Sequence, residues 1–248
     1  GIHLSQKTSQ KKLLLSFSLI INLGMLGFFK YFNFFIDSWV DLVQGLGYHV
    51  NSTTTLSIIL PVGISFYTFQ TLSYTLDVYY KRLNPTNNFI NFATFVSLFP
   101  QLVAGPIERA KNLIPQIEKA RSFSQEKFSE GLTLIVWGLF KKVVIADSLA
   151  PLVDKIFLDS TLYDGGTLLL GIFYFTFQIY CDFSGYSDIA IGTAKCLGFD
   201  FMTNFNYPYF AKNIGDFWRR WHISLSSWFR DYVFIPLGGS KVSTTLFV

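Results

Sequence analysis

Charged side chains are scarce in this sequence. Only 15% of its 248 residues are charged, against roughly 25% in an ordinary soluble domain, while 50% are hydrophobic and the mean hydropathy is +0.36. A soluble fold would have to hide 28 phenylalanines and 13 tyrosines, whereas such rings fill helix contacts in a bilayer and collect at its interfaces. The composition argues against a soluble domain and predicts a membrane protein surrounded by lipid.

Cysteine and histidine are also rare. The two cysteines, Cys181 and Cys196, have neither metal-site spacing nor the density of a disulfide framework. His3, His49 and His222 lack the spacing of metal ligands, so neither a metal nor a bound cofactor is expected. The net charge of +4 lies between apolar runs and forms no clustered basic face. No nucleic-acid partner is therefore expected.

Processing signals, repeats and flexible linkers are missing too. No signal peptide of the usual layout, solenoid repeat or low-complexity tract is visible. The sequence starts at Gly1 without a methionine, and a new apolar run has just begun when it stops at Val248. We interpret residues 1–248 as a single partial transmembrane domain, incomplete at both ends.

Long apolar runs predict the membrane segments. Leu13 to Phe35 is long enough to span a bilayer, which takes about 20 helical residues. The run from Leu56 to Tyr80 contains Pro61 and Gly63 near its start and should be a broken or tilted span. The segment 89–107 is short, ends in prolines and is flanked by basic residues on both sides, so we expect it to dip into the membrane and return.

Two later apolar runs carry ionisable groups. Gly131 to Leu149 contains the adjacent Lys141 and Lys142, and Thr167 to about Ser187 contains Asp182. Such groups are costly at membrane depth and normally face protein or water. We therefore expect these side chains to face protein or water.

The distribution of Lys and Arg predicts the orientation. Basic residues are absent from 36–80, and the next outer loop holds only Lys155, whereas segments 7–12, 81–127 and 195–241 are rich in them. Because Lys and Arg favour the cytoplasmic side, the start of the chain should lie in the cytoplasm. The alternation of apolar runs and basic segments indicates a chain that crosses the membrane several times.

The stretch "FWRRWHISLSSWFRDY", residues 217–232, surrounds His222 with aromatic and cationic side chains. On one continuous helix at about 100° per residue, His222 would lie on a seam between two faces. One face holds Trp218, Leu225 and Phe229, and the other holds Arg219, Ser226 and Arg230. Such a seam suits a neutral imidazole base, but an interfacial amphipathic helix with a bystander histidine explains the composition as well.

The stretch "CDFSGYSDIAIG" places Asp182, Ser184, Tyr186 and Asp188 around Gly185. Polar groups inserted there would shape a substrate cavity. A helix kink or cap explains them equally well, so both interpretations stay open.

Four stretches together resemble a known family. They are "PVGISFYTFQTLSYTLDVYY", "FPQLVAGPIERAKNLIPQI", "YCDFSGYSDIAIGTAKCLGF" and "NFNYPYFAKNIGDFWRRWHISLSSWFRDYVFIPLGG", within residues 61–239. In this order they resemble the membrane-bound O-acyltransferases, and within them the bacterial branch that O-acetylates alginate. The resemblance implies an all-α, multi-helix transmembrane bundle with re-entrant or broken helices around a tunnel. Acyl-CoA would enter that tunnel from the cytoplasm, and a hydroxyl acceptor would approach from the opposite side.

The resemblance also implies roles for individual residues. His222 would be the base, or would orient the hydroxyl, in acetyl transfer from the co-substrate acetyl-CoA. An extracytoplasmic acetyltransferase partner would finish transfer to a polysaccharide acceptor, and a second family histidine is expected beyond Val248. Candidates for contacts with the CoA phosphates, the acyl path and the cavity are Lys212, Arg219, Arg220, Trp218, Trp221, Trp228, Gln178, Asp182 and Tyr186.

Other functions stay open at this point. Peptidoglycan or teichoic-acid acyl transfer would use the same mechanism with another acceptor. A polytopic transporter or export channel is a different class, suggested by the broken spans and intramembrane charges.

Overall fold

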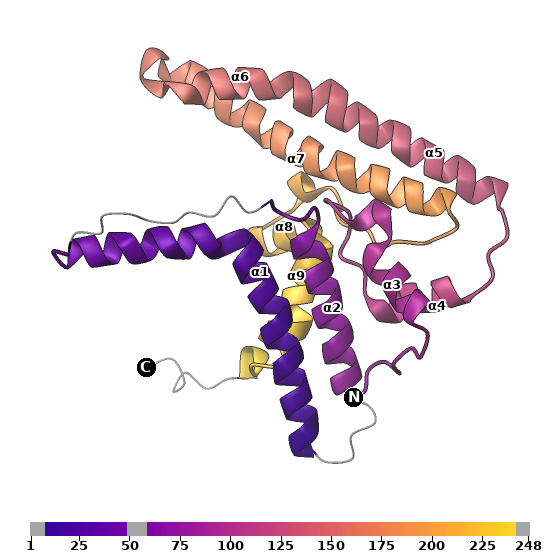
Figure 1. Ribbon diagram of the computed structural model, residues 1–248. Helices are drawn as coiled ribbons and strands as arrows, with labels where there is room; N and C mark the ends of the chain where they lie inside the picture. Colours follow the sequence, from indigo (N-terminus) through magenta and orange to yellow (C-terminus); the bar gives the residue numbers. More distant parts are fainter. Residues whose placement is uncertain (1–7, 49–58, 242–248) are drawn as a thin grey trace. The chain divides into compact units, whose positions relative to one another are not determined.

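The computed structural model describes residues 8–48 and 59–241 of the chain. These residues form two compact units, Gly1–Phe89 and Ile90–Val248, which are treated separately below. All regular elements in the described ranges are helices (Figure 1). This confirms the all-α prediction, while the single 1–248 domain stays a prediction.

The first unit is a pair of helices, α1 (Thr8–Gly45) and α2 (Ile64–Tyr79), that pack on each other. The predicted first span lies inside α1, whose ribbon is visibly bent in Figure 1. Thr71 Oγ1 of α2 donates a 2.7 Å hydrogen bond to Asn22 Oδ1 of α1. Helix α2 begins only after Gly63, which has a left-handed φ of 77°. Residues 59–63 before it are not helical, residues 56–58 of that run lie outside the described residues, and the broken or tilted span expected there stays a prediction.

The second unit begins with short helices. They are α3 (Phe89–Ser97), the 3-10 turn η1 (Phe99–Gln101) and α4 (Ala110–Glu118). Residues 105–110 between η1 and α4 are buried. The segment 89–107 is thus a short helix and a turn followed by a buried connection, and its expected dip into the membrane stays a prediction.

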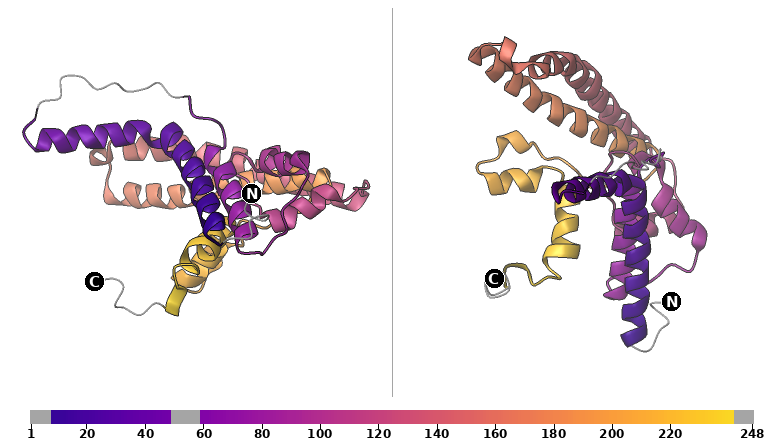
Figure 2. Two further views of the ribbon diagram at one scale, coloured as in Figure 1. Left: turned by 60° about the horizontal axis from the view of Figure 1, so that its bottom comes forward. Right: turned by 60° about the vertical axis from the view of Figure 1, so that its left-hand side comes forward.

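A long helical hairpin forms most of the second unit. Its first arm runs from α5 (Gln125–Leu139) through the π-helical η2 (Phe140–Ala146) into α6 (Asp147–Leu158). After the turn η3 (Ser160–Leu162), the second arm is α7 (Gly165–Cys196). The two arms pack along their lengths, as Figures 1 and 2 show from different directions.

Glycines bring the arms of this hairpin into close contact. A Cβ atom on Gly138 would lie 2.5 Å from the carbonyl oxygen of Gly185, and one on Gly131 would lie 2.6 Å from that of Gly192. Small residues allow such close backbone approach between helices in lipid. The hairpin therefore depends on four glycines that face one another in pairs.

Two adjacent lysines in η2 both pair with α7. Lys141 Nζ lies 2.6 Å from Asp188 Oδ2 and 3.0 Å from Ser184 Oγ, and Lys142 Nζ lies 2.6 Å from Asp182 Oδ1. Lys141 is buried, as expected for an ionisable group within an apolar run. Lys142 and Asp182 have protein partners but are also partly exposed, in agreement with the expectation that such groups face protein or water.

The last part of the chain is built from short pieces. They are η4 (Pro208–Phe210), α8 (Ile214–Arg220), α9 (Ile223–Phe229), the π-helical η5 (Arg230–Phe234) and η6 (Gly239–Lys241). Helix α8 starts after Asn213, whose side chain accepts a hydrogen bond from the backbone N–H of Asp216 at 2.8 Å, an ordinary N-cap.

Two helices in the described ranges are long and apolar enough to cross a bilayer, within Ser9–Gly45 and Gly165–Cys196. Further crossings, the tunnel and the multi-pass topology stay predictions.

Candidate functional site

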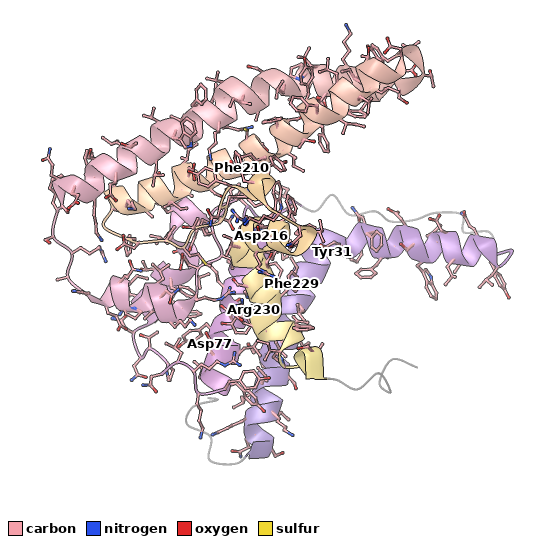
Figure 3. The ribbon with its side chains drawn as sticks, turned by 180° about the vertical axis from the view of Figure 1, so that it is seen from behind. Tyr31, Asp77, Phe210, Asp216, Phe229 and Arg230 are labelled. Atoms are coloured by element: carbon pink, nitrogen blue, oxygen red, sulfur yellow. The ribbon has the colours of Figure 1, made fainter. Side chains whose placement is uncertain are left out.

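The helix expected across residues 217–232 is interrupted at His222, so the prediction of one continuous helix is wrong. Helix α8 ends at Arg220 and α9 begins at Ile223. Between them, Trp221 is extended, and His222 is left-handed with φ 43° and ψ 55°. The right panel of Figure 2 shows α8 and α9 pointing in different directions. Figure 3 shows Asp216 on α8, and Phe229 and Arg230 on the pieces after the break.

The seam deduced from helical arithmetic therefore does not exist. Trp218 and Arg219 belong to α8, while Ser226 and Phe229 belong to α9, and no single helix axis relates them to His222. The left-handed conformation costs a non-glycine residue about 1–2 kcal/mol. Strain of this kind persists only where the surroundings enforce it, and it is common at functional sites.

The buried amide of Asn204 fixes the His222 ring. His222 Nδ1 lies 2.9 Å from Asn204 Oδ1, which also receives the Ser224 hydroxyl at 2.9 Å and the Ser224 backbone N–H at 3.3 Å. The backbone carbonyl of Asn204 accepts the N–H of Ile223 at 2.8 Å. Both Asn204 and Ser224 are 0% exposed. The turn at His222 is thus tied to the segment around Asn204 by side-chain and main-chain bonds.

These bonds identify the tautomer of the histidine. A backbone N–H only donates, so the Asn204 atom facing Ser224 must be the oxygen, and its nitrogen donates to Ser187 Oγ at 3.1 Å. Because that oxygen only accepts, His222 Nδ1 must carry the hydrogen in their shared bond. The lone pair of the neutral ring therefore lies on Nε2. Orientation of one ring nitrogen by a fixed partner prepares the other as a base.

Aromatic rings surround the other sides of His222. The Phe183 ring of α7 meets it edge-on at 4.7 Å, and the Phe205 ring lies nearly parallel at 6.4 Å. Trp221 packs on Phe205 at 5.1 Å and on Phe217 at 5.6 Å. Burial lowers the pKa of His222 from 6.5 to about 4. The imidazole is therefore neutral at physiological pH.

The residues predicted around His222 are divided among several places. Arg219 and Lys212 are exposed near α8, and Trp218 is 55% exposed there. Arg220 pairs with Asp216 at 3.1 Å. Two of the predicted residues contact the aromatic group formed with Phe205 and Phe217: Trp221 packs on both rings, and Trp218 meets Phe217 edge-on at 5.3 Å.

The remaining predicted residues lie on α7 and α9. Asp182 is on a different side of α7 from Phe183, because it pairs with Lys142. Gln178 and Tyr186 are half-buried on α7, four residues to either side of Asp182. Trp228 is buried against Tyr232, with ring centroids 5.2 Å apart, on the part of α9 that follows Ser224. Asp182 and Trp228 thus have contacts with Lys142 and Tyr232, respectively.

Several residues at the site were not among the candidates identified from the sequence. They are Asn204, Ser224, Ser187, Phe183 and Phe205. Asn204 belongs to the turn-rich piece "NFNYPYF", in which asparagine is expected to fix the backbone direction, as would also position a site helix. Its link to His222 spans 18 residues and follows no helical or strand period. Among the described residues, no group of three His, Cys, Asp or Glu side chains is arranged to hold a metal ion.

Comparison with known proteins adds to this geometry. The family model described as MBOAT, membrane-bound O-acyltransferase family, matches residues 86–248. The chain is 47% identical over 238 residues to the "Probable alginate O-acetylase AlgI" of Pseudomonas aeruginosa, covering 96% of this chain and 45% of that protein. It is 45% identical over 238 residues to the protein of the same name in Azotobacter vinelandii, covering 96% and 47%.

A "Peptidoglycan O-acetyltransferase" of Helicobacter pylori is 38% identical over 267 residues, covering 97% of this chain and 50% of that protein. The chain thus spans about half the length of the curated relatives it matches.

Proposed function

Because the chain belongs to the membrane-bound O-acyltransferase family, we propose that it acts in moving an acetyl group from cytoplasmic acetyl-CoA toward a hydroxyl of an extracytoplasmic, alginate-like polysaccharide. The observation that carries this proposal is the His222 ring, neutral and held by Asn204 with Nε2 as its basic nitrogen. The names of the relatives from Pseudomonas and Azotobacter support alginate as the acceptor class.

The chemistry follows from the free nitrogen. His222 Nε2 takes the proton of the acceptor hydroxyl while the hydroxyl oxygen attacks the thioester carbonyl of acetyl-CoA. The C–S bond then breaks, the CoA sulfur takes up the proton, and an O-acetyl ester is left on the acceptor. Asn204 Oδ1 stabilises the imidazolium formed on the way, because the Nδ1–H continues to donate to it. A positioned base of this kind contributes about 10² to 10⁴-fold to the rate.

The surroundings of His222 fit this reaction. Phe183, Phe205 and Trp221 exclude water that would hydrolyse the thioester. Exposed cations near α8, Lys212 and Arg219, are suited to the CoA phosphates. We place α8 on the cytoplasmic side of a bacterial inner membrane, crossed several times, following the distribution of Lys and Arg.

A partner protein and the acceptor complete the proposal. An extracytoplasmic acetyltransferase would receive the acetyl group and finish its transfer to the polysaccharide. Peptidoglycan is the second candidate acceptor, favoured by the relative from Helicobacter. A transporter would move substrate without releasing CoA, so measuring the free thiol separates that class from an acyltransferase.

The test uses the full-length protein with His222→Ala and His222→Gln, and His49→Ala as a control for losing a histidine elsewhere. We expect His222→Ala to lower acetyl-CoA-dependent thiol release and polysaccharide acetylation by about 10² to 10⁴-fold at unchanged membrane level. Full activity in His222→Gln would show that hydrogen bonding suffices and that proton transfer is not its role. Near wild-type acetylation by the His222→Ala variant would refute the proposal.

A further inference from the structure

Two consecutive buried charges, Glu108 and Arg109, lie between the segments that carry Asn204 and His222. Glu108 is 1% exposed and Arg109 is 4% exposed. The proposed chemistry uses neither of them. A buried charge is costly unless it is paired or hydrogen-bonded, so the contacts of these two side chains show which parts of the fold they hold.

The Arg109 guanidinium holds the start of α9. Its Nη2 donates to the backbone carbonyl oxygen of Ser224 at 3.4 Å and to Ser227 Oγ at 3.2 Å. Asp231 Oδ2 lies 4.0 Å away, and the group stacks over the Tyr232 ring at 5.2 Å from its centroid. One planar cation therefore fixes the first turn of α9 and the turn that follows that helix. Ser224 is the second residue after the histidine.

The Glu108 carboxylate holds the other partner of the histidine. Its Oε1 accepts the backbone N–H of Met202, two residues before Asn204. Burial is the main influence on this carboxyl and raises its pKa to about 7. The protonated and ionised forms both keep an oxygen that accepts from Met202. The contact therefore does not depend on which form is present.

Their neighbouring positions let the two side chains reach opposite ways. Arg109 has an extended backbone, with φ −90° and ψ 139°, and successive side chains of extended backbone point to opposite faces. The preceding residues are fixed on α7, where Ser187 Oγ donates to the carbonyl oxygen of Ala104 at 3.4 Å. Ser187 also accepts the amide of Asn204. One short segment thus contacts α7, the Asn204 segment and α9.

We propose that Glu108 and Arg109 are positioning residues that together set the hydrogen bond between Asn204 and His222. They act through the backbone of Met202 and Ser224. The inference rests on the proposed role of His222 in acyl transfer. It gives the buried residues 107–109 a structural role in that same acyl transfer.

The experiment uses the full-length protein together with its partner acetyltransferase, acetyl-CoA and the polysaccharide acceptor. Its variants are Arg109→Gln, Arg109→Lys, Glu108→Ala and Glu108→Gln, and the matched control is Lys111→Gln, an exposed cation two residues after Arg109. We expect Arg109→Gln and Glu108→Ala to lower kcat at least tenfold with KM for acetyl-CoA changed less than about twofold, because catalysis but not binding is disturbed. Glu108→Gln keeps the acceptor oxygen and should retain activity. Arg109→Lys should recover little, because an ammonium lacks the planar fork.

The pH dependence of kcat/KM separates positioning from general damage. When the hydrogen bond between Asn204 and His222 is lost, the His222 ring becomes more solvated and its pKa rises toward 6.5. The acidic limb of the plot of kcat/KM against pH then moves to higher pH. The side chains against the ring are Asn204, Ser224, Phe183 and Phe205, none of which titrates between pH 4 and 7. A merely structural defect would lower the rate at every pH and leave the limb in place.

The outcomes distinguish the two proposals. If His222→Ala abolishes activity while Arg109→Gln keeps both wild-type kcat and the wild-type acidic limb, the positioning inference is overturned and the proposed function survives. The same follows if Arg109→Gln loses rate with an unmoved limb. If His222→Ala retains activity, the proposed function itself fails. A shifted limb with lowered kcat, and rescue by Glu108→Gln, supports the inference.

Discussion

Replacing Asn204 by alanine removes the acceptor shared by three donors, namely the His222 Nδ1–H, the Ser224 N–H and the Ser224 hydroxyl. Two effects follow. The imidazolium formed during proton transfer loses its fixed partner, and Ser224 is left with buried donors. The first effect acts on the rate and the second on stability, so the two are measured separately.

The magnitude follows from the change in charge. A hydrogen bond to a charged group contributes about 1.5–3 kcal/mol and a neutral one about 0.5–1.5. The bond between His222 and Asn204 should therefore favour the transition state by about 1–2 kcal/mol more than the ground state, a factor of about 5–30 in kcat. Loss of the tautomer preference lowers kcat further, so this is a minimum. A buried donor left without an acceptor costs about 1–3 kcal/mol of unfolding free energy.

The assay is the initial rate of thiol release at saturating acetyl-CoA by the full-length protein in detergent, with the thermal midpoint recorded for each variant. Asn206→Ala is the control, because that side chain is exposed two residues further on. Asn204→Asp keeps an acceptor and should retain more activity than Asn204→Ala. Its acidic limb should move to higher pH, because a carboxylate beside the ring raises the pKa of His222. A kcat for Asn204→Ala within twofold of wild type would refute the tautomer argument.

Two further predictions concern stability. The folded pKa of His222 is about 4, below the unfolded value of 6.5. The unfolded chain therefore binds its proton first on acidification, and stability falls between about pH 6.5 and 4, by up to roughly 3 kcal/mol. His222→Gln should lack this part of the acid sensitivity, and equal acid sensitivity in calorimetry at several pH values would contradict it. Gly185→Ala places a Cβ 2.8 Å from a carbonyl oxygen of α5. The free energy of unfolding measured in detergent should therefore fall by about 1–3 kcal/mol. Gly24→Ala, with nothing within 4 Å of the new Cβ, should be neutral or slightly stabilising, and equal losses in both variants would show that the hairpin contact is not tight.

Hydropathy predicted the long apolar helices α1 and α7, because those features depend on local sequence and the bilayer. The same reasoning failed at His222. Helical arithmetic assumes that the backbone stays helical, whereas the left-handed turn there is imposed by Asn204, 18 residues away. Trp218 and Trp228, equally prominent in the sequence, were directed elsewhere by that turn.

The buried pair Glu108 and Arg109 is a second case in which local sequence patterns could not predict a long-range contact. They follow the segment 89–107, which was expected to dip into the membrane, and Arg109 was counted only among the basic residues that flank it. Their contacts with Met202 and Ser224 join positions more than 90 residues apart in the chain. No local pattern encodes such a contact, and the family resemblance identified the segment without explaining it.

The wide turn η2 has a mechanical consequence for the long hairpin. An α-helix turns about 100° per residue, so neighbouring side chains seldom serve one partner helix, but the π-helical turn lets Lys141 and Lys142 reach Asp188 and Asp182 together. Sliding α7 along α5 by one turn would separate both pairs at once and leave charges facing hydrocarbon. The two ion pairs thus fix the axial register of α7 against the other arm of the hairpin. The facing glycines set only how closely the two arms approach each other.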